Sequence, residues 1–228
     1  MNKVTLALSG GMDSTTLLGF FLHNYPYTKI HCCIFHYGSK HNMHENIAAH
    51  NIFEYYQEKT NRLTLSEIDL TNIFSLSKSN LLKHGESIPE GHYASENMKK
   101  TVVPGRNLIF IAVMASIAES IDSDCIAYGA HSGDHFIYPD CRSNFVDSAR
   151  NTVYLSTDKK VTLIAPFMSL NKTKILKCSK DFSIPVPYYL TRTCYKDQPI
   201  ACGKCGSCNE RLEAFNAVNM TDTIEYRR

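Results

Sequence analysis

The sequence predicts an α/β protein with a doubly wound, mostly parallel sheet and a small C-terminal subdomain that binds zinc through four cysteines. Two observations support this fold class. Short apolar segments alternate with longer segments of helical spacing, a pattern typical of a parallel sheet that helices cover on both faces. Four of the nine cysteines are also concentrated within fifteen positions near the C-terminus. We expect residues 1–190 to form the α/β domain and residues 191–228 to form the zinc-binding subdomain.

The N-terminal part of the chain alternates predicted strands with predicted helices. Lys3–Leu8 is a short and nearly continuous apolar run, as expected of a buried parallel strand. A Ser-Gly-Gly turn follows, and Ser14–Asn24 then places four large apolar residues at helical spacing. Lys29–His36 and Leu63–Asp69 are predicted as further strands, and the segment from Asn42 to Lys59 between them is predicted as a helix.

The same alternation continues in the C-terminal part of the chain. Asn107–Ser120 is strongly apolar and is predicted as a helix, and Cys125–Gly129 is predicted as the next strand. Val161–Ala165 is expected to be the last strand, and Lys172–Ser179 begins another helix.

Two segments interrupt this alternation. Ser75–Arg106 is polar, contains prolines and glycines and shows no sustained periodicity. Such a long loop within a compact domain is usually functional or disordered. The second segment is the cysteine-rich tail from Thr193 onward, which ends in a short polar segment of helical character.

Charge and hydropathy exclude some classes of function. The formal charge is 24 − 22 = +2, which is too small for a surface that coats nucleic acid but leaves small anionic ligands open. No apolar run reaches membrane length, and the N-terminus lacks the charged and apolar regions of a signal peptide. We therefore expect a cytoplasmic protein with no membrane partner, whose scattered cysteines are reduced.

The first motif, Leu8-Ser9-Gly10-Gly11-Met12-Asp13-Ser14-Thr15, lies between a predicted strand and a predicted helix. Glycines at such a place let the backbone approach a ligand, and the helix N-terminus adds partial positive charge. A phosphate group suits both features. The spacing fits neither the Walker pattern, because no lysine follows the glycines, nor G-x-G-x-x-G. The alternative is a glycine-rich turn in which Ser and Asp only cap the helix.

The second motif is formed by Cys194, Cys202, Cys205 and Cys208. Four thiolates at these short spacings can surround one ion tetrahedrally, and all-sulfur tetrahedral sites favour zinc. An iron–sulfur cluster is the alternative, since Cys-x2-Cys-x2-Cys also occurs in ferredoxins. A closed four-cysteine site has no open coordination position, so we expect a structural metal.

Polar strings between these two motifs suggest a substrate site. Thr101-Val102-Val103-Pro104-Gly105-Arg106-Asn107 precedes the apolar helix, and Gly129–His135 leaves the end of a predicted strand and leads to Tyr138-Pro139-Asp140-Cys141-Arg142. In open parallel sheets, ligands bind beyond the carboxyl ends of the strands. Asp134 and Asp140 offer acceptors for the donors of a guanine-like edge, and Arg142 offers a fork for a carboxylate. The alternative is a solvated loop with incidental charges.

Ser-Gly-Gly-x-Asp-Ser after an N-terminal strand resembles the pyrophosphate loop of the N-type ATP pyrophosphatases. Together with Gly91-His92-Tyr93, Val-Pro-Gly-Arg-Asn, Tyr-Pro-Asp-Cys-Arg and the four cysteines, it resembles the 7-cyano-7-deazaguanine synthase (QueC) family from Leu6 to about Asn209. The sequence departs from that pattern at His36, His44 and Lys174, near the expected nucleotide contacts.

This resemblance implies a set of site residues. The ATP-binding residues would be Leu8, Ser9, Gly10, Gly11, Met12, Asp13, Ser14, Thr15, Thr16, Leu17 and Leu18. The catalytic residues would be Ser9, Asp13, Ser14, Arg106 and Lys172, and the substrate-binding residues Asp134, Tyr138, Asp140 and Arg142.

The resemblance also implies a reaction. An ATP-dependent ligase would convert 7-carboxy-7-deazaguanine and ammonia to 7-cyano-7-deazaguanine through an adenylylated acid and an adenylylated amide, with magnesium as a further cofactor and with a homodimeric assembly. An enzyme that stops at the amide, or that passes the activated deazaguanine to a macromolecular amine, is the alternative. A nucleic-acid-binding zinc module is a third hypothesis, but the tail lacks interleaved aromatic and basic residues, which argues against a nucleic-acid partner.

Overall fold

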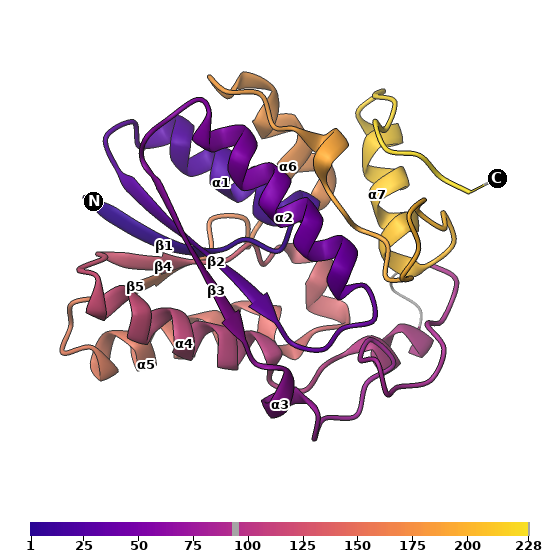
Figure 1. Ribbon diagram of the computed structural model, residues 1–228, viewed down its shortest axis with the longest axis horizontal. Coiled ribbons are helices and arrows are strands. Elements are labelled where there is room, and N and C mark those ends of the chain that lie inside the picture. The colour runs from indigo at the N-terminus through magenta and orange to yellow at the C-terminus, as the bar shows by residue number, and fades with distance from the viewer. Residues whose placement is uncertain (93–95, 228) are drawn as a thin grey trace.

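A computed structural model of the protein describes residues 1–92 and 96–227, so Tyr93 of the Gly-His-Tyr string lies outside the described residues. Its centre is a five-stranded parallel sheet with the order β3-β2-β1-β4-β5 (Figure 1). The strands are β1 (Lys3–Ala7), β2 (Lys29–His36), β3 (Leu63–Asp69), β4 (Cys125–Ala127) and β5 (Thr162–Ile164). Each lies within or at a predicted strand, and the parallel sheet confirms the predicted class.

Helices cover both faces of this sheet. One face carries α1 (Met12–Asn24), α2 (Asn42–Gln57) and α6 (Lys172–Cys178), and the other carries α4 (Arg106–Ser120) and α5 (Ser143–Ser156) (Figure 1). Each face has its own apolar core, since Leu17, Ile52 and Ile175 belong to one cluster and Met114 and Val146 to the other. The fold is therefore doubly wound, as the alternating elements predict.

Two helical elements differ from the sequence-based expectation. Helix α1 begins at Met12 rather than Ser14, because the backbone N–H of Thr15 donates to the carbonyl of Gly11 at 3.1 Å and closes the first turn there. Helix α5 was not predicted. Its sequence is mostly polar, and only Val146, Ala149 and Val153 are buried against the sheet.

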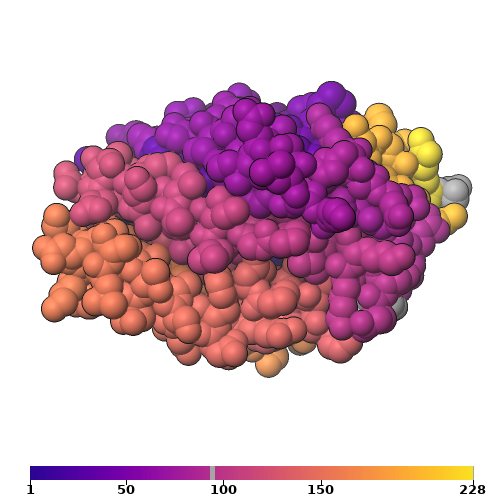
Figure 2. Space-filling model, turned by 90° about the horizontal axis from the view of Figure 1, so that it is seen from below, coloured from indigo at the N-terminus to yellow at the C-terminus, as the bar shows by residue number. Residues whose placement is uncertain are grey.

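Most of the remaining elements lie around the carboxyl ends of the strands, whereas the 3-10 helix Ser179–Asp181 continues α6 toward the C-terminal end of α1. The remaining elements are α3 (Thr71–Phe74), α7 (Gly206–Ala217) and the 3-10 helices Glu96–Thr101, Ser132–Phe136, Pro139–Cys141, Ser179–Asp181 and Tyr188–Leu190. The long segment after α3 lies beside the cysteine-rich tail (Figures 1 and 2). The backbone N–H of Gly91 donates to the carbonyl of Lys204 at 3.1 Å, and Asn209 donates to the carbonyl of Gly91 at 2.7 Å. Among the described residues, none of the helices has the length and hydropathy needed to cross a membrane.

Candidate functional site

A cavity of about 220 Å³ opens beyond the carboxyl ends of β1, β2 and β4. Leu8 and Ser9 follow β1, Tyr37 follows β2 and Gly129 follows β4, and all four line the cavity. Its apolar wall includes Ile34, Phe35, Phe110, Ile111 and Met114 from β2 and α4. The cavity thus lies at the carboxyl ends of the parallel strands, where a ligand site is expected from the sequence.

The first motif forms a tight loop at this edge. Gly10 has a φ of 75°, and a Cβ atom on it would lie 2.6 Å from the backbone nitrogen of Ala49 and 2.7 Å from the carbonyl oxygen of Glu45. Only glycine therefore allows α2 to pack this closely on the loop. The Ser9 and Ser14 hydroxyls lie 3.1 Å apart across the loop.

The amide groups at the start of α1 remain available to a ligand. Gly11 caps this helix without a side-chain hydrogen bond, and among the described residues no side chain accepts from the N–H groups of Met12, Asp13 or Ser14. Backbone N–H groups and the helix dipole at such a terminus favour an anion.

The predicted ATP-binding residues divide into two groups. Leu8, Ser9, Gly11, Met12, Asp13 and Ser14 line the cavity. Gly10 and Thr15 to Leu18 do not, and the last four are fully buried within α1. Thr16, for example, donates to the Met12 carbonyl at 2.8 Å and contacts the Tyr188 hydroxyl at 2.9 Å. These four residues support the loop from beneath.

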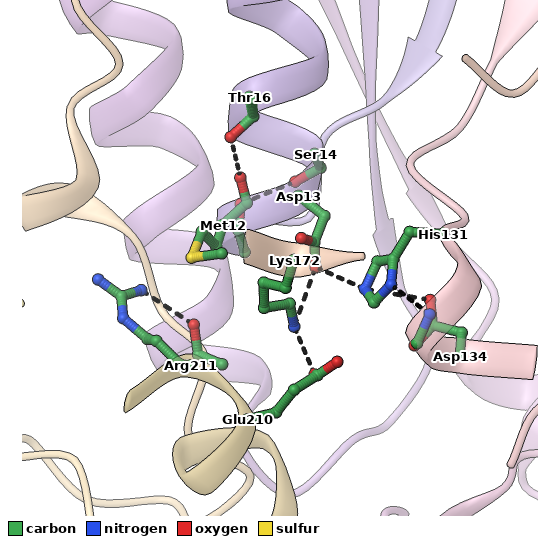
Figure 3. A network of polar contacts seen from close by, with 12 residues as sticks. Met12, Asp13, Ser14, Thr16, His131, Asp134, Lys172, Glu210 and Arg211 are labelled. Atoms are coloured by element: carbon green, nitrogen blue, oxygen red, sulfur yellow. Dashed lines mark hydrogen bonds and ion pairs between the residues drawn. The ribbon is translucent and has the colours of Figure 1, made fainter. Parts of the chain in front are cut away.

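Five charged or titratable side chains form a network beside the loop (Figure 3). Lys172, at the start of α6, lies 3.3 Å from a carboxylate oxygen of Asp13 and donates to Glu210 at 2.6 Å. His131 Nε2 lies 3.5 Å from carboxylate oxygens of both Asp13 and Asp134. Because His131 Nδ1 accepts from the Gly133 N–H at 3.1 Å, the ring proton of the neutral form is on Nε2, facing the two carboxylates.

The network holds Asp13, His131 and Lys172 in their charged forms. Burial alone would raise the pKa of Asp13, but the nearby charges of Lys172 and His131 outweigh burial and hold this pKa well below its usual range. Burial alone lowers the pKa of His131, but Asp134 and Asp13 raise it to about 9. For Lys172, burial is outweighed by Asp13 and Glu210, so its pKa lies above the usual value. Lys172 is therefore a buried ammonium ion at neutral pH.

Arg106, Tyr37 and Tyr138 form a second polar group that lines the same cavity. The Arg106 guanidinium lies 5.4 Å from the ring centroid of Tyr37 and 5.8 Å from that of Tyr138, and its one hydrogen bond is to the Tyr37 hydroxyl at 3.4 Å. Within the described part of the chain, no carboxylate lies at ion-pair distance from this guanidinium. Arg106 is thus a cation that faces the cavity with no direct ion pair among the described residues, and Asp140 and Glu45 interact with its charge from a longer distance.

Glu45, from the first turn of α2, also faces this cavity. Ser39 donates to one of its carboxylate oxygens at 3.4 Å, and His41 Nε2 lies 3.3 Å from the same oxygen. Burial raises the pKa of Glu45 to about 7 and lowers that of His41 to about 3, so a neutral imidazole adjoins a carboxyl group that titrates near neutrality.

The predicted substrate-binding residues are only partly brought together. Asp134 and Tyr138 line the cavity, whereas Asp140 and Arg142 do not. Asp140 accepts the backbone N–H of Asn107 at 2.9 Å and so caps the start of α4. Arg142 is exposed, and its Nε donates to the carbonyl of His135 at 3.0 Å.

The four cysteines of the second motif come together in the tail. Their sulfur atoms all lie within 4.8 Å of one another, and all four residues are buried. The backbone N–H groups of Cys202 and Cys205 donate to cysteine sulfurs at 3.3 Å. Gly203, with a φ of 68°, provides the turn that this arrangement needs. The set can hold a tetrahedral metal ion, as the spacing predicts.

Three charged residues of the site were not predicted from the sequence. Glu45 directly follows His44, and the family resemblance singled out His44 rather than Glu45. Arg192 lines the cavity, and its backbone N–H donates to the Gly10 carbonyl at 2.8 Å. Glu210 reaches Lys172 from α7, two residues after the last cysteine. No local sequence signal distinguishes these side chains from solvated charges.

Comparison with known proteins gives the family. Residues 3–219 match the sequence profile of the family described as queuosine biosynthesis protein QueC. Relatives named 7-cyano-7-deazaguanine synthase from Marinomonas sp. and Caldicellulosiruptor saccharolyticus are 39% and 40% identical over 226 residues. These alignments cover 98% of this chain and 98% and 95% of the relatives.

One solved structure is similar to this protein, and the similarity concerns the fold alone. A 4-thiouridine synthetase in complex with RNA and ATP superposes with a TM-score of 0.50 at 18% identity, over 99% of this chain and 47% of that chain. The match to the family profile and the identity to its relatives both extend over almost the whole chain. The chain therefore belongs to the QueC family.

Proposed function

We propose that this protein is an ATP-dependent carbon–nitrogen ligase that converts 7-carboxy-7-deazaguanine and ammonia to 7-cyano-7-deazaguanine. The observation that carries the proposal is the likeness, over almost the entire chain, to relatives that bear the name 7-cyano-7-deazaguanine synthase. The cavity supports it independently, because it combines an anion-binding loop with a second polar group that contains an unpaired guanidinium.

The proposed reaction has two activation steps. The substrate carboxylate attacks the α-phosphorus of ATP, which forms an acyl-adenylate and releases pyrophosphate. Ammonia then displaces AMP and leaves a primary amide. In the second activation the amide oxygen attacks the α-phosphorus of another ATP and releases a second pyrophosphate; the adenylylated amide then loses AMP and the two nitrogen-bound protons to form the nitrile. No covalent enzyme intermediate is needed, so the protein contributes positioning and charge stabilisation.

We assign the pyrophosphate part of ATP to the loop and to Lys172. The free amides at the start of α1 and the Ser9 and Ser14 hydroxyls can donate to phosphate oxygens. The buried ammonium of Lys172 supplies positive charge where the departing pyrophosphate gains negative charge. The adenine ring suits the apolar wall of Phe35, Phe110 and Met114.

The residues beside the loop fit magnesium. Asp13 Oδ1 is buried and has no hydrogen-bond partner within the described part of the chain. A buried carboxylate oxygen of this kind suits a hard cation that also contacts phosphates. Magnesium would neutralise part of the phosphate charge there.

We assign the substrate carboxylate to Arg106 rather than to Arg142. Arg106 faces the cavity and makes no direct ion pair among the described residues, whereas Arg142 is exposed and binds a backbone carbonyl. A guanidinium fork matches the two oxygens of a carboxylate. Asp134 and Tyr138 remain the proposed contacts of the deazaguanine ring, because both line the cavity.

The four cysteines suit one structural zinc ion. Zn–S bonds of about 2.3 Å in a tetrahedron place sulfur atoms roughly 3.8 Å apart, and the Cys202 and Cys208 sulfurs lie 3.9 Å apart. A thiolate site and ATP chemistry both suit the reducing cytoplasm, where we place the enzyme. Homodimerisation, which the family resemblance implies, is part of the proposal.

Mass spectrometry of a defined reaction tests the proposed function. Purified protein with 7-carboxy-7-deazaguanine, ammonium, magnesium and ATP is expected to produce the nitrile, AMP and pyrophosphate. Release of ADP and phosphate would contradict adenylylation. An amide that accumulates without any nitrile would show that the enzyme stops after the first activation.

A further inference from the structure

The metal-binding tail contributes a charged side chain to the phosphate end of the cavity. Glu210 lies on α7 in the tail, and its carboxylate accepts from Lys172 Nζ at 2.6 Å (Figure 3). This contact is shorter than the 3.3 Å that separates Lys172 from Asp13. Both side chains of the pair are largely shielded from water, with 7% of Lys172 and 15% of Glu210 exposed.

The surroundings of Glu210 hold its carboxylate in this position. Cys208, two residues earlier, belongs to the metal cluster. Arg211, the next residue, is fully buried and donates to Asp222 at 2.7 and 2.8 Å and to Thr191 at 2.6 Å. Oε1 of Glu210 occupies space that is open only because residue 133 is glycine, since a Cβ there would lie 2.7 Å from it. The backbone of Glu210 is therefore fixed on both sides.

We propose that Glu210 is an internal competitor of pyrophosphate for Lys172. This inference rests on the proposed function, in which Lys172 binds the departing pyrophosphate. When no nucleotide is bound, the Glu210 carboxylate accepts a hydrogen bond from the Lys172 ammonium, and an incoming phosphate must displace this carboxylate. After each activation the Glu210–Lys172 ion pair forms again, which favours the release of pyrophosphate before the next ATP binds. Glu210 is a positioning residue, since it acts through Lys172.

A charge-neutral variant gives an effect of distinctive sign. Glu210→Gln keeps the size and an acceptor oxygen but removes the negative charge that competes for Lys172. Charge-assisted hydrogen bonds are stronger than neutral ones, so we expect inorganic pyrophosphate to bind roughly tenfold more tightly. The KM for ATP and the pyrophosphate concentration that inhibits turnover should both fall by a similar factor. A merely structural role predicts the opposite, with weaker binding and a lower melting temperature.

Isothermal titration calorimetry with inorganic pyrophosphate and magnesium is the direct test. Glu213→Gln is the matched control, because Glu213 lies on the same helix with 59% of its side chain exposed and pairs only weakly with His92 at 3.7 Å. It should bind pyrophosphate as the unmodified protein does. Zinc content and thermal unfolding, measured on each variant, show that α7 is intact.

The outcomes separate this inference from the proposed function. Lys172→Met should weaken pyrophosphate binding; if it does not, the proposed phosphate site is wrong and both proposals fail. If Lys172→Met weakens binding but Glu210→Gln binds pyrophosphate like Glu213→Gln, the competition alone is refuted. Weaker binding by a folded Glu210→Gln protein would also refute it, because Glu210 would then assist the phosphate, for example through a cation.

Discussion

Replacing Gly10 with alanine tests how closely α2 packs on the phosphate-binding loop. Gly10 has a φ of 75°, and the new Cβ would lie 2.6 Å from the Ala49 nitrogen and 2.7 Å from the Glu45 carbonyl oxygen. Both are backbone atoms of a helix, so neither can rotate away. The left-handed conformation costs about 1–2 kcal/mol, and the overpacking costs about 1–3 kcal/mol. The free energy of unfolding should therefore fall by about 2–5 kcal/mol.

Gly38→Ala is the matched control for this variant. Gly38 has nearly the same φ, 76°, but the nearest atom to its new Cβ would be the Thr71 Cγ2 at 3.4 Å, an ordinary contact. It should therefore lose only the conformational part, about 1–2 kcal/mol.

Denaturant and thermal unfolding at equal metal content measure the difference. For a protein of this size, each kcal/mol corresponds to a melting-temperature change of roughly 2–4 °C. Equal losses in the two variants would refute the argument, because the clash with α2 would then contribute nothing.

Asp13→Ala should abolish turnover while the protein still folds, with a melting temperature lowered by the loss of the contacts to Lys172 and His131; a folded variant with near-normal activity would remove the loop from the mechanism. Arg106→Lys should weaken substrate binding in calorimetry by about 1–3 kcal/mol, because lysine lacks the planar fork, and Arg142→Lys should not; the reverse order would contradict our assignment. The folded-state pKa of His131, about 9, lies above the ordinary 6.5, so its stabilisation is complete below pH 6.5 and is lost as the pH rises through 9. Between pH 6.5 and pH 9 the free energy of unfolding, measured with denaturant, should fall by about 3 kcal/mol in the unmodified protein but not in His131→Gln. An equal fall in both proteins would count against the network. Elemental analysis should find about one zinc per chain, and Cys205→Ser should unfold the tail; iron with visible absorbance, or a stable and active metal-free protein, would contradict this.

The fold could be predicted largely because its signals are local. The central strands are buried on both faces, so their sequences are mostly apolar, and Val4 and Leu6 of β1 are fully buried. Helix α5 escaped prediction because only one narrow side of it is buried, at Val146, Ala149 and Val153, and the remainder of its sequence resembles a solvated loop.

The functional residues were predicted to very different degrees. The loop at the cavity and the grouping of the four cysteines could be predicted because each lies within a few consecutive turns of chain, where spacing alone restricts the geometry; phosphate binding by the loop stays a prediction. Asp140 and Arg142 were correctly located near the strand ends, yet their side chains point to the backbone of neighbouring elements instead of into the cavity. Spacing does not determine side-chain direction in a loop.

The sequence by itself therefore determined the class of fold, the glycine-rich loop between β1 and α1 and the four-cysteine cluster that could hold a metal, because these depend on periodicity and on residues that are near one another in the chain. Only the tertiary structure decided which charges share the cavity. Lys172 and Glu210 are 38 positions apart, and Arg106 and Tyr37 are 69 apart. Such pairs form when the sheet and the tail bring distant segments together. An isolated glutamate or arginine looks the same in the sequence whether it is buried in a site or solvated at the surface.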